Sequence, residues 1–384
     1  MSASLRVGVI GIGIMGTSHA RQLSGNQHCV VVALADQLSG RAEGLARELG
    51  AAAYGDYREM LARESLDVVV VATPDPFHRG PVEAAAAAGV RNILCEKPLA
   101  TTVEDAEAML VAVRRAGSRI VTNFINRTFP LDIATRYFIQ SGLLGQPVCG
   151  DARVDDNMSV PTTMWGERSR QWASGSSSAH FLLSHVSDLL RWYFSPAEVE
   201  GVYAISQRCI LGYTPDLYDG YFFFDNGLKV RVKAEWVKEI DELVTFDFAA
   251  TGTEGCLIYN KLPGFGGLQG LRLNLNGARD VEALAAHQEA LRQKGIRARV
   301  ISRVSRPDVG EGTRYGFELY AADQKQAHKN MVAYAMDAFT EGREVPSSWE
   351  GNGSLPWDDE GLKATKIVCA LMESAEKRRE VAIG

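Results

Sequence analysis

The chain has 384 residues, of which 46% are hydrophobic and 23% are charged, a composition typical of a globular enzyme and unlike that of a disordered chain. This length is more than one hydrophobic core usually fills, so two domains are expected. The net charge is −6 and no block of Lys and Arg stands out. A nucleic-acid partner is not expected, because phosphate binding needs clustered cations.

The sequence gives no sign of a membrane segment or a metal centre. Apolar runs such as residues 30–35 and 68–72 are far too short to cross a bilayer, and residues 1–4 do not resemble a leader peptide. The six cysteines are scattered without Cys-x-x-Cys spacing, as is typical of reduced thiols. The seven histidines do not cluster with cysteines or carboxylates at ligand spacing. We therefore expect a cytoplasmic protein with no membrane partner and no catalytic metal.

The first 125 residues alternate between short apolar strands and helices. Strands are expected at residues 5–10, 29–35, 67–72, 92–95 and 119–123. Their nearly continuous Val, Ile and Leu content is typical of parallel strands buried on both faces. Helices are expected at residues 40–49, 81–88 and 102–116, and each is followed directly by a glycine. This alternation predicts an α/β Rossmann domain with a doubly wound parallel sheet.

From residue 126 the pattern becomes α+β. Helices are expected at residues 130–141 and 181–194, and strands at 148–154, 221–224, 228–232, 244–250 and 256–259. The turn Asp225-Asn226-Gly227 and the segment 251–255 predict antiparallel pairing. Helices at 321–341 and 358–379 close the chain, while residues 260–316 are expected to be irregular apart from a helix at 280–293. The domains are thus 1–125 and 126–384, the second with a large, mostly antiparallel open sheet and C-terminal helices that could pack back on the first.

A glycine-rich turn, Gly11-Ile12-Gly13-Ile14-Met15-Gly16, joins the first expected strand to a helix. Gly11 permits a tight turn, Gly13 lets the backbone approach a pyrophosphate, and Gly16 lets the helix pack on the strand. The amides that open the helix would face the phosphates. Asp36 follows 20 residues after Gly16, at the end of the second strand, where it would accept hydrogen bonds from a ribose. Because its charge would repel a 2′-phosphate, NAD is favoured over NADP.

The tripeptide Glu96-Lys97-Pro98 follows the strand at 92–95. A lysine at the C-terminal edge of a parallel strand, in the domain that holds the dinucleotide, can reach the reacting end of that cofactor. With Gly16-Thr17-Ser18-His19, Ala72-Thr73-Pro74-Asp75-Pro76-Phe77-His78 and Ser184-His185-Val186-Ser187-Asp188, the chain resembles the glucose-fructose oxidoreductase, inositol dehydrogenase and rhizopine-catabolism (Gfo/Idh/MocA) family. The resemblance covers the first domain well and the second more loosely. It implies an NAD(P)-dependent dehydrogenase acting on CH–OH groups, assembled as a homodimer or homotetramer.

The resemblance also implies roles for matching residues. Glu96 would contact the cofactor ribose, and Lys97 would stand beside the nicotinamide and the substrate hydroxyl. His185 would be the catalytic acid–base, with Asp188 on the same helical face to orient the ring or to pack. The remaining cofactor contacts implied are Thr73, Pro74, His78 and Asn126, and Arg127 next to them is either a contact or structural.

Position 181 departs from the family, many of whose members have an aspartate four residues before the histidine. Here Phe181 stands after His180, and Ser176-Ser177-Ser178 replaces the usual glycine triplet. Since phenylalanine cannot relay a proton, His185 would work without that carboxylate, helped by His180 or by water.

Aromatic and cationic residues precede this helix in what is expected to be a loop: Trp165, Arg168, Arg170 and Trp172. Such groups suit a sugar ring, which offers apolar C–H faces and hydroxyls. They are equally consistent with packing anchors and solvated arginines.

Three functions remain open from the sequence. The first is reversible oxidation of a secondary hydroxyl of a sugar, cyclitol or related polyol by hydride transfer to NAD. The second is a redox-neutral epimerase or eliminase that passes through a transient keto sugar and regenerates the cofactor. The third is a non-enzymatic, dinucleotide-sensing regulator, which the retention of Lys97 and His185 argues against.

Overall fold

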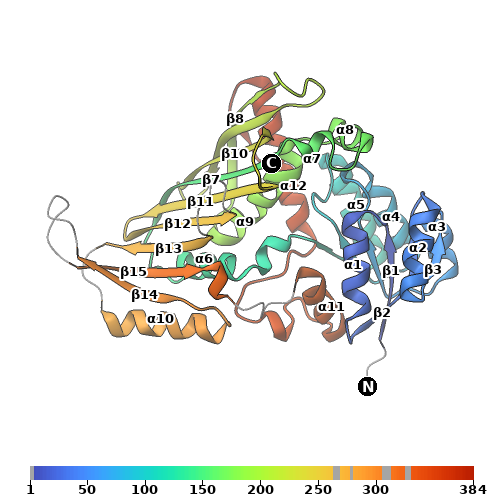
Figure 1. The fold of residues 1–384 in the computed structure, drawn as a ribbon, viewed down its shortest axis with the longest axis horizontal. Coiled ribbons are helices and arrows are strands. Elements are labelled where there is room, and N and C mark those ends of the chain that lie inside the picture. The colour runs from blue at the N-terminus through green and yellow to red at the C-terminus, as the bar shows by residue number, and fades with distance from the viewer. Residues whose placement is uncertain (1–3, 263–268, 277–279, 305–312, 325–329) are drawn as a thin grey trace. The chain divides into compact units, whose positions relative to one another are not determined.

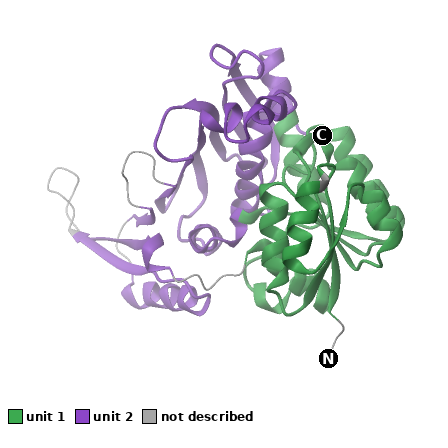
Figure 2. Ribbon diagram, turned by 45° about the vertical axis from the view of Figure 1, so that its right-hand side comes forward, with its two compact units in different colours: residues 1–125, 329–369 green, residues 126–328, 370–384 purple. Residues whose placement is uncertain are grey.

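The structure is a computed structural model that describes residues 4–262, 269–276, 280–304, 313–324 and 330–384. The chain divides into two compact units (Figure 2). The first contains residues 1–125 and 329–369, and the second contains residues 126–328 and 370–384.

The first unit is built on a six-stranded parallel sheet in the order β3-β2-β1-β4-β5-β6 (Figure 1). The strands are β1 Leu5–Ile10, β2 Cys29–Ala35, β3 Ala52–Tyr54, β4 Val68–Val71, β5 Asn92–Cys95 and β6 Arg119–Thr122. All pairs run parallel, and the order reverses between β1 and β4. This confirms the doubly wound sheet, in which ligands bind at the carboxyl ends of the strands near the reversal.

Helices cover this sheet in two layers. They are α1 Ile14–Ser24, α2 Ser39–Leu49, α3 Tyr57–Arg63, α4 Arg79–Ala87, α5 Val103–Ala116 and α11 Met331–Glu341, with α12 Asp359–Lys377 leading into the second unit. One layer joins α1 to α2 and α11, and the other joins α3, α4 and α5. The helix expected at 102–116 is α5, which Thr102 caps by accepting from the Asp105 amide at 3.1 Å and which Gly117 ends at a φ of +68°.

Two differences from the sequence expectation fall in this unit. The short β3 and α3 were not expected, because three strand residues give too little periodic signal. The helix expected at 321–341 begins only at Met331, since Asn330 caps it by accepting from the Ala333 amide at 2.9 Å. Residues 325–329 of that expected helix lie outside the described residues.

The second unit contains a ten-stranded sheet in the order β14-β15-β13-β12-β11-β7-β10-β9-β8-β16. The strands are β7 Pro147–Asn157, β8 Val199–Gln207, β9 Leu217–Phe224, β10 Lys229–Lys238, β11 Val244–Gly252, β12 Gly255–Leu262, β13 Gly270–Leu275, β14 Arg299–Val304, β15 Thr313–Tyr320 and β16 Val381–Ala382. Only β7 and β10 pair in parallel among these described strands. The expected α+β unit with a large, mostly antiparallel sheet is therefore confirmed, and Gly227 makes the predicted turn between β9 and β10 at a φ of +86°.

The expectation that residues 260–316 are irregular is wrong for much of that stretch. β13, β14 and the start of β15 extend the sheet there, and Leu271, Leu273 and Leu275 on β13 point inward at 2% exposure or less. The helix expected there is confirmed as α10 Val281–Gln293, capped by Asp280. Residues 263–268, 277–279 and 305–312 lie outside the described residues.

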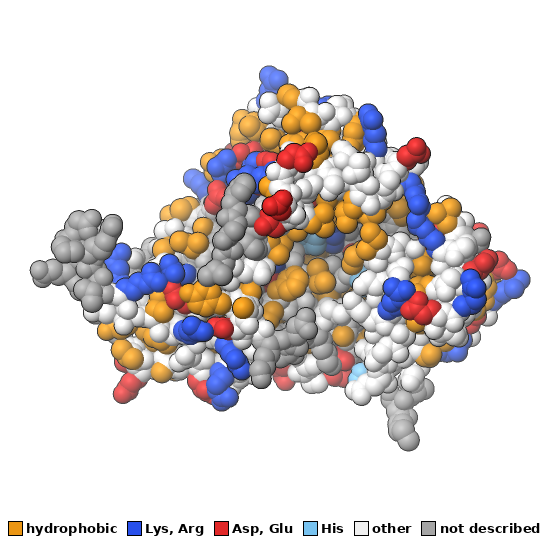
Figure 3. Space-filling view, viewed as in Figure 1, with side chains coloured by type: hydrophobic (Ala, Val, Ile, Leu, Met, Phe, Trp, Pro, Cys, Tyr) orange, Lys and Arg blue, Asp and Glu red, His pale blue; other side chains and the backbone are white. Residues whose placement is uncertain are grey.

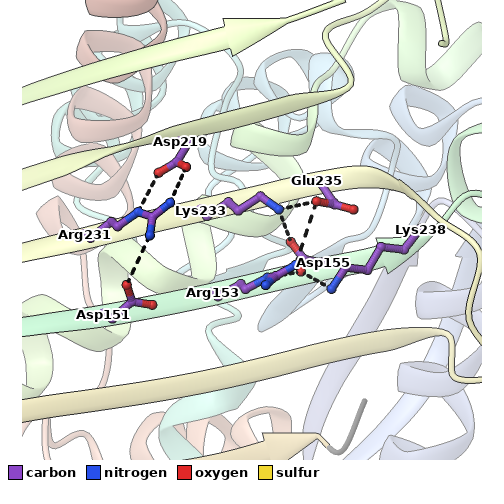
Figure 4. Close-up of polar contacts among 8 residues, drawn as sticks. All are labelled: Asp151, Arg153, Asp155, Asp219, Arg231, Lys233, Glu235 and Lys238. Carbon is purple, nitrogen blue, oxygen red and sulfur yellow. Dashed lines mark hydrogen bonds and ion pairs between the residues drawn. The ribbon is translucent and has the colours of Figure 1, made fainter. Parts of the chain in front are cut away.

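One face of the large sheet packs on helices and the other carries charges. The helical segments of this unit are α6 Pro130–Gln140, α7 Ser159–Thr162, α8 Glu167–Ser174, a π-helical turn at Ala179–Leu183 and α9 Ser184–Phe194. Val232 and Trp236 on β10 are fully buried, whereas Arg231, the residue before Val232, points to the other face and reaches Asp219 on β9 (Figure 4). The pleat thus separates a hydrophobic face from a face of paired charges.

The surface shows no block of one charge in the view of Figure 3, where Lys and Arg alternate with Asp and Glu. Among the described residues, no helix is both long and apolar enough to cross a membrane.

Candidate functional site

The glycine turn leaves space at one glycine and none at the other two. Gly11 has a φ of +90°, and a Cβ built there would lie 2.6 Å from the Ala72 carbonyl oxygen. A Cβ at Gly16 would lie 1.8 Å from the Gly11 carbonyl oxygen. At Gly13, by contrast, no described heavy atom lies within 4 Å of a built Cβ. Gly11 and Gly16 therefore serve the fold, while Gly13 leaves space for an approaching phosphate, and Ile14 and Met15 after it are exposed.

Asp36 lies directly after β2 and is bonded to this turn. One carboxylate oxygen accepts from the Ile12 amide at 2.7 Å, and the other accepts from the Leu38 amide at 2.8 Å. Each oxygen keeps a second lone pair for a ribose hydroxyl. The residues present therefore fit the adenosine end of a dinucleotide.

His78, which the resemblance implies as a cofactor contact, is buried and holds two loops together. Its ring is 1% exposed. Nδ1 lies 2.9 Å from the Pro98 carbonyl oxygen, and Nε2 lies 2.8 Å from that of Thr73. Burial alone would lower the pKa of His78. Cys95, Asp75 and the Thr73 carbonyl outweigh burial and raise this pKa to about 10. Carbonyl oxygens at both nitrogens favour the imidazolium form, in which both nitrogens donate. The loop after β4 that His78 contacts contains the half-buried Thr73 and the exposed Pro74.

Lys97 is half-buried at the carboxyl end of β5, and Glu96 before it is buried. The Glu96 carboxylate is bonded to His19 on α1 and to Asn123 after β6. Glu96, which the resemblance implies as a ribose contact, is thus held by two side chains of this unit. Asn123 has no role in the sequence motifs, and His19 only closes one of them. The sequence signal that could have identified them is their position, near the start of the first helix for His19 and after a parallel strand for Asn123.

In the second unit, His185 lies half-buried in the first turn of α9, with the half-buried Phe181 one turn earlier in the π-helical segment. Asp188 is fully buried, and its carboxylate accepts hydrogen bonds from Arg127 at 2.9 and 2.5 Å. This bidentate ion pair gives both residues a structural role. His180 is also buried, and its Nδ1 lies 3.1 Å from the Ser177 hydroxyl.

Asn126, an expected cofactor contact, belongs to a buried network that sequence reasoning missed. Its side-chain oxygen accepts from the Lys261 ammonium at 2.8 Å, and this ammonium lies 2.8 Å from the Asp132 carboxylate. Burial lowers the pKa of Lys261 despite the attraction of Asp132, and burial raises the pKa of Asp132 despite Lys261. Because the Asn126 oxygen is used, its amide NH₂ is the group left to meet a ligand.

The aromatic residues expected in a loop lie on or before the helix α8, which corrects that expectation. The Trp172 ring contacts those of Trp165, Phe181 and the buried Trp236, with centroids 4.6, 4.9 and 5.3 Å apart. Phe181 thus completes an aromatic cluster with Trp172 and Trp236. Arg170 stacks on Tyr213 at 4.7 Å, whereas Arg168 is exposed on the same helix.

Over the described ranges, no group of three or more His, Cys, Asp or Glu side chains could hold a metal ion.

Comparison with known families gives two matches. The model described as "Oxidoreductase family, NAD-binding Rossmann fold" (GFO_IDH_MocA) matches residues 5–124. The model of the GFO/IDH/MocA C-terminal domain matches residues 133–258.

Two curated relatives are each 34% identical to part of this chain. The inositol 2-dehydrogenase of Acidothermus cellulolyticus matches over 219 residues, 56% of this chain and 61% of the relative. The 1,5-anhydro-D-fructose reductase of Ensifer adhaerens matches over 205 residues, 52% of this chain and 59% of the relative. The chain thus spans about three fifths of the length of these relatives.

Solved structures show the same fold over nearly the whole chain. An oxidoreductase from Agrobacterium radiobacter, in complex with NAD⁺, L-tartaric acid and magnesium, superposes with a TM-score of 0.74 at 20% identity, covering 100% of this chain and 99% of the other. Levoglucosan dehydrogenase in complex with NADH and L-sorbose gives a TM-score of 0.74 at 23% identity, covering 99% of each chain. With both domain models matched in order, this chain belongs to the Gfo/Idh/MocA family of oxidoreductases, and residues 5–124 are that family's NAD-binding Rossmann domain.

Proposed function

We propose that this protein is an NAD-dependent dehydrogenase that oxidises a secondary hydroxyl of a sugar, cyclitol or related polyol. The observation that carries the proposal is the placement of Lys97 in the first unit. Its half-buried amine follows β5, at the same edge of the sheet as the open Gly13 backbone and the Asp36 carboxylate. Ligands bind at this edge in doubly wound sheets.

The two proposed catalytic residues divide the work on the hydroxyl. His185 would take the hydroxyl proton, and the Lys97 ammonium would stabilise the negative charge that develops on the oxygen. NAD, when bound, would accept the hydride from the reacting carbon. Asn126 would present its amide NH₂ to an acceptor on the cofactor or substrate, because Lys261 holds its oxygen at 2.8 Å.

The similar proteins support a polyhydroxylated ring as the substrate. Their names include inositol 2-dehydrogenase, 1,5-anhydro-D-fructose reductase and levoglucosan dehydrogenase, the last solved with NADH and L-sorbose or levoglucosan. Trp165 and Trp172, both half-buried, would offer aromatic faces to the C–H side of such a ring.

NAD is proposed over NADP because the Asp36 carboxylate would face the adenosine ribose. Its carboxylate is fixed by two backbone amides. A 2′-phosphate at that place would meet a fixed negative charge.

We also propose a homo-oligomer that uses the charged face of the large sheet. Tyr203, Ile205, Tyr221 and Ile258 on that face are 39 to 55% exposed among its ion pairs. Sedimentation velocity of the purified protein tests this, and a monomer at micromolar concentration would contradict it.

The activity is tested by incubating the protein with NAD and a panel of sugars, cyclitols and glycosides. Reduced cofactor is followed by absorbance and products by mass spectrometry. Steady accumulation of NADH with one substrate is the expected result. Product formed without NADH would instead indicate the redox-neutral route, and cofactor binding without any product would indicate a sensor.

A further inference from the structure

Three donors converge on one buried carboxylate in the first unit. The Glu96 side chain is 7% exposed, and His19 and Asn123 are each 2% exposed. Oε1 of Glu96 lies 2.5 Å from His19 Nε2 and 2.6 Å from Asn123 Nδ2. Oε2 accepts the backbone N–H of Lys97 at 3.2 Å. Both oxygens of this carboxylate are thus held in place.

The donors come from elements that are far apart in the sequence. His19 is on α1, one turn beyond the glycine turn, and Asn123 follows β6. Backbone hydrogen bonds fix the frame, because the Glu96 amide donates to Val71 at 2.9 Å and the Asn123 amide donates to Cys95 at 2.7 Å. The cluster therefore joins the carboxyl ends of β4, β5 and β6 to the first helix, directly beneath Lys97.

The arrangement favours an ionised Glu96. Burial raises the pKa of Glu96, but the hydrogen bonds of His19 and Asn123 and the charge of Lys97 bring it below its usual value. Within the described residues, His19 Nδ1 is buried without a hydrogen-bond partner. In the neutral His19 ring, the single N–H proton would therefore be on Nε2, which donates to the Glu96 carboxylate.

An ionised Glu96 acts in turn on Lys97. An opposite charge nearby favours the charged form of an amine, and little water lies near a carboxylate this buried to screen it. The Lys97 charge in turn lowers the pKa of Glu96, so the two groups lie close enough to interact. Glu96 is thus a carboxylate that acts on Lys97.

We propose that His19 and Asn123 are positioning residues that hold Glu96 as a fixed counter-charge to Lys97, so that Lys97 is cationic when a hydroxyl approaches it. The benefit of a cationic Lys97 rests on the proposed function, whereas the measurement of its charge does not. The charge on Lys97 can be followed in the whole protein without substrate.

The test is competitive labelling of amines with acetic anhydride across a pH series, with the Lys97 peptide quantified by mass spectrometry. In Glu96→Gln, the Lys97 midpoint should fall by about one to three pH units. His19→Leu and Asn123→Leu should lower it less, and His19→Gln, which restores a donor, should bring it back toward the wild-type value. Glu48→Gln is the matched control, since it neutralises a carboxylate that pairs with Arg21 at the surface of the same unit.

An unchanged Lys97 midpoint in folded Glu96→Gln would overturn the proposal, as would equal midpoints in His19→Leu and His19→Gln. Folding is checked by circular dichroism and NADH binding. If His19→Leu does not fold, Asn123→Leu and the isosteric Glu96→Gln decide. If the variants show these midpoint shifts but the wild-type protein shows no NAD-linked turnover, the proposed function is contradicted and the positioning role stands.

Discussion

The Asp36 carboxylate accepts a hydrogen bond from the backbone N–H of Ile12 at 2.7 Å. This contact ties the end of β2 to the middle of the glycine turn. If Asp36 faces the ribose as proposed, one side chain both shapes the turn and sets the choice of cofactor.

Asp36→Asn keeps the shape of the side chain and removes its charge. We expect NADH binding to weaken about 10- to 100-fold, since hydrogen bonds to charged groups contribute about 1.5–3 kcal/mol, and the preference for NADH over NADPH to shrink. Titration by cofactor fluorescence measures both. Asp56→Asn is the control, because Asp56 accepts the Arg58 amide at 2.8 Å as the cap of α3. A wild-type protein that binds NADPH as tightly as NADH would refute the role of Asp36.

The glycines of the turn should separate folding from cofactor binding. Gly16→Ala places a methyl group 1.8 Å from a backbone oxygen and should cost about 1–3 kcal/mol of stability. Gly13→Ala meets no described atom within 4 Å, so its melting temperature should stay near the wild-type value. Its NADH affinity should nevertheless fall about tenfold or more, equivalent to about 1.4 kcal/mol. Thermal melts with and without NADH check the pair, and wild-type affinity in Gly13→Ala would show that no phosphate approaches there.

His78 makes stability depend on pH. The ordinary pKa of histidine is 6.5 and that of the folded His78 is about 10. A pKa raised by folding contributes stability that is complete below pH 6.5 and is lost as pH rises toward 10. Nitrogen NMR of the histidine rings at pH 8 should show both His78 nitrogens protonated. A pyridine-like nitrogen on that ring at pH 8 would mean that the carbonyl clamp does not hold an imidazolium.

Removing one partner of the Arg127–Asp188 ion pair should strongly destabilise the second unit. Asp188→Asn leaves a guanidinium that is 1% exposed without its counter-charge, a change that typically costs about 3–5 kcal/mol. Glu289→Gln is the control, because its pair with Arg292 is 47 and 72% exposed and should contribute at most about 1 kcal/mol. Urea unfolding measures both, and equal losses would contradict the structural role of the buried pair.

Local sequence signals predicted the parts of the fold that depend on local chemistry. The strands β1, β2 and β5 have the expected bounds because their Val, Ile and Leu runs are bounded by turn residues. β13 was missed although Leu271 and Leu273 alternate with polar residues, because the strand is short and glycines surround it.

The buried polar clusters could not be predicted in the same way. Lys261 on a strand would be expected to face solvent, and its burial depends on Asp132 in a distant helix. Likewise, no local pattern joins His19 to Glu96, since α1 and the end of β5 meet only in the folded sheet. Motif matching located Lys97 and His185 on the chain, whereas the contacts that fix their neighbours required the structure.

We propose that Lys97 and His185 act on a hydroxyl whose carbon gives a hydride to NAD. The decisive experiment follows deuterium transfer from carbon-deuterated myo-inositol, glucose and related polyols to C4 of the nicotinamide by mass spectrometry. We expect transfer by the wild-type protein with at least one polyol, and a loss of about 10² to 10⁴-fold in rate for Lys97→Met and His185→Gln with NADH affinity retained. Absence of label in NADH with every polyol, or wild-type transfer rates in both variants, would contradict it.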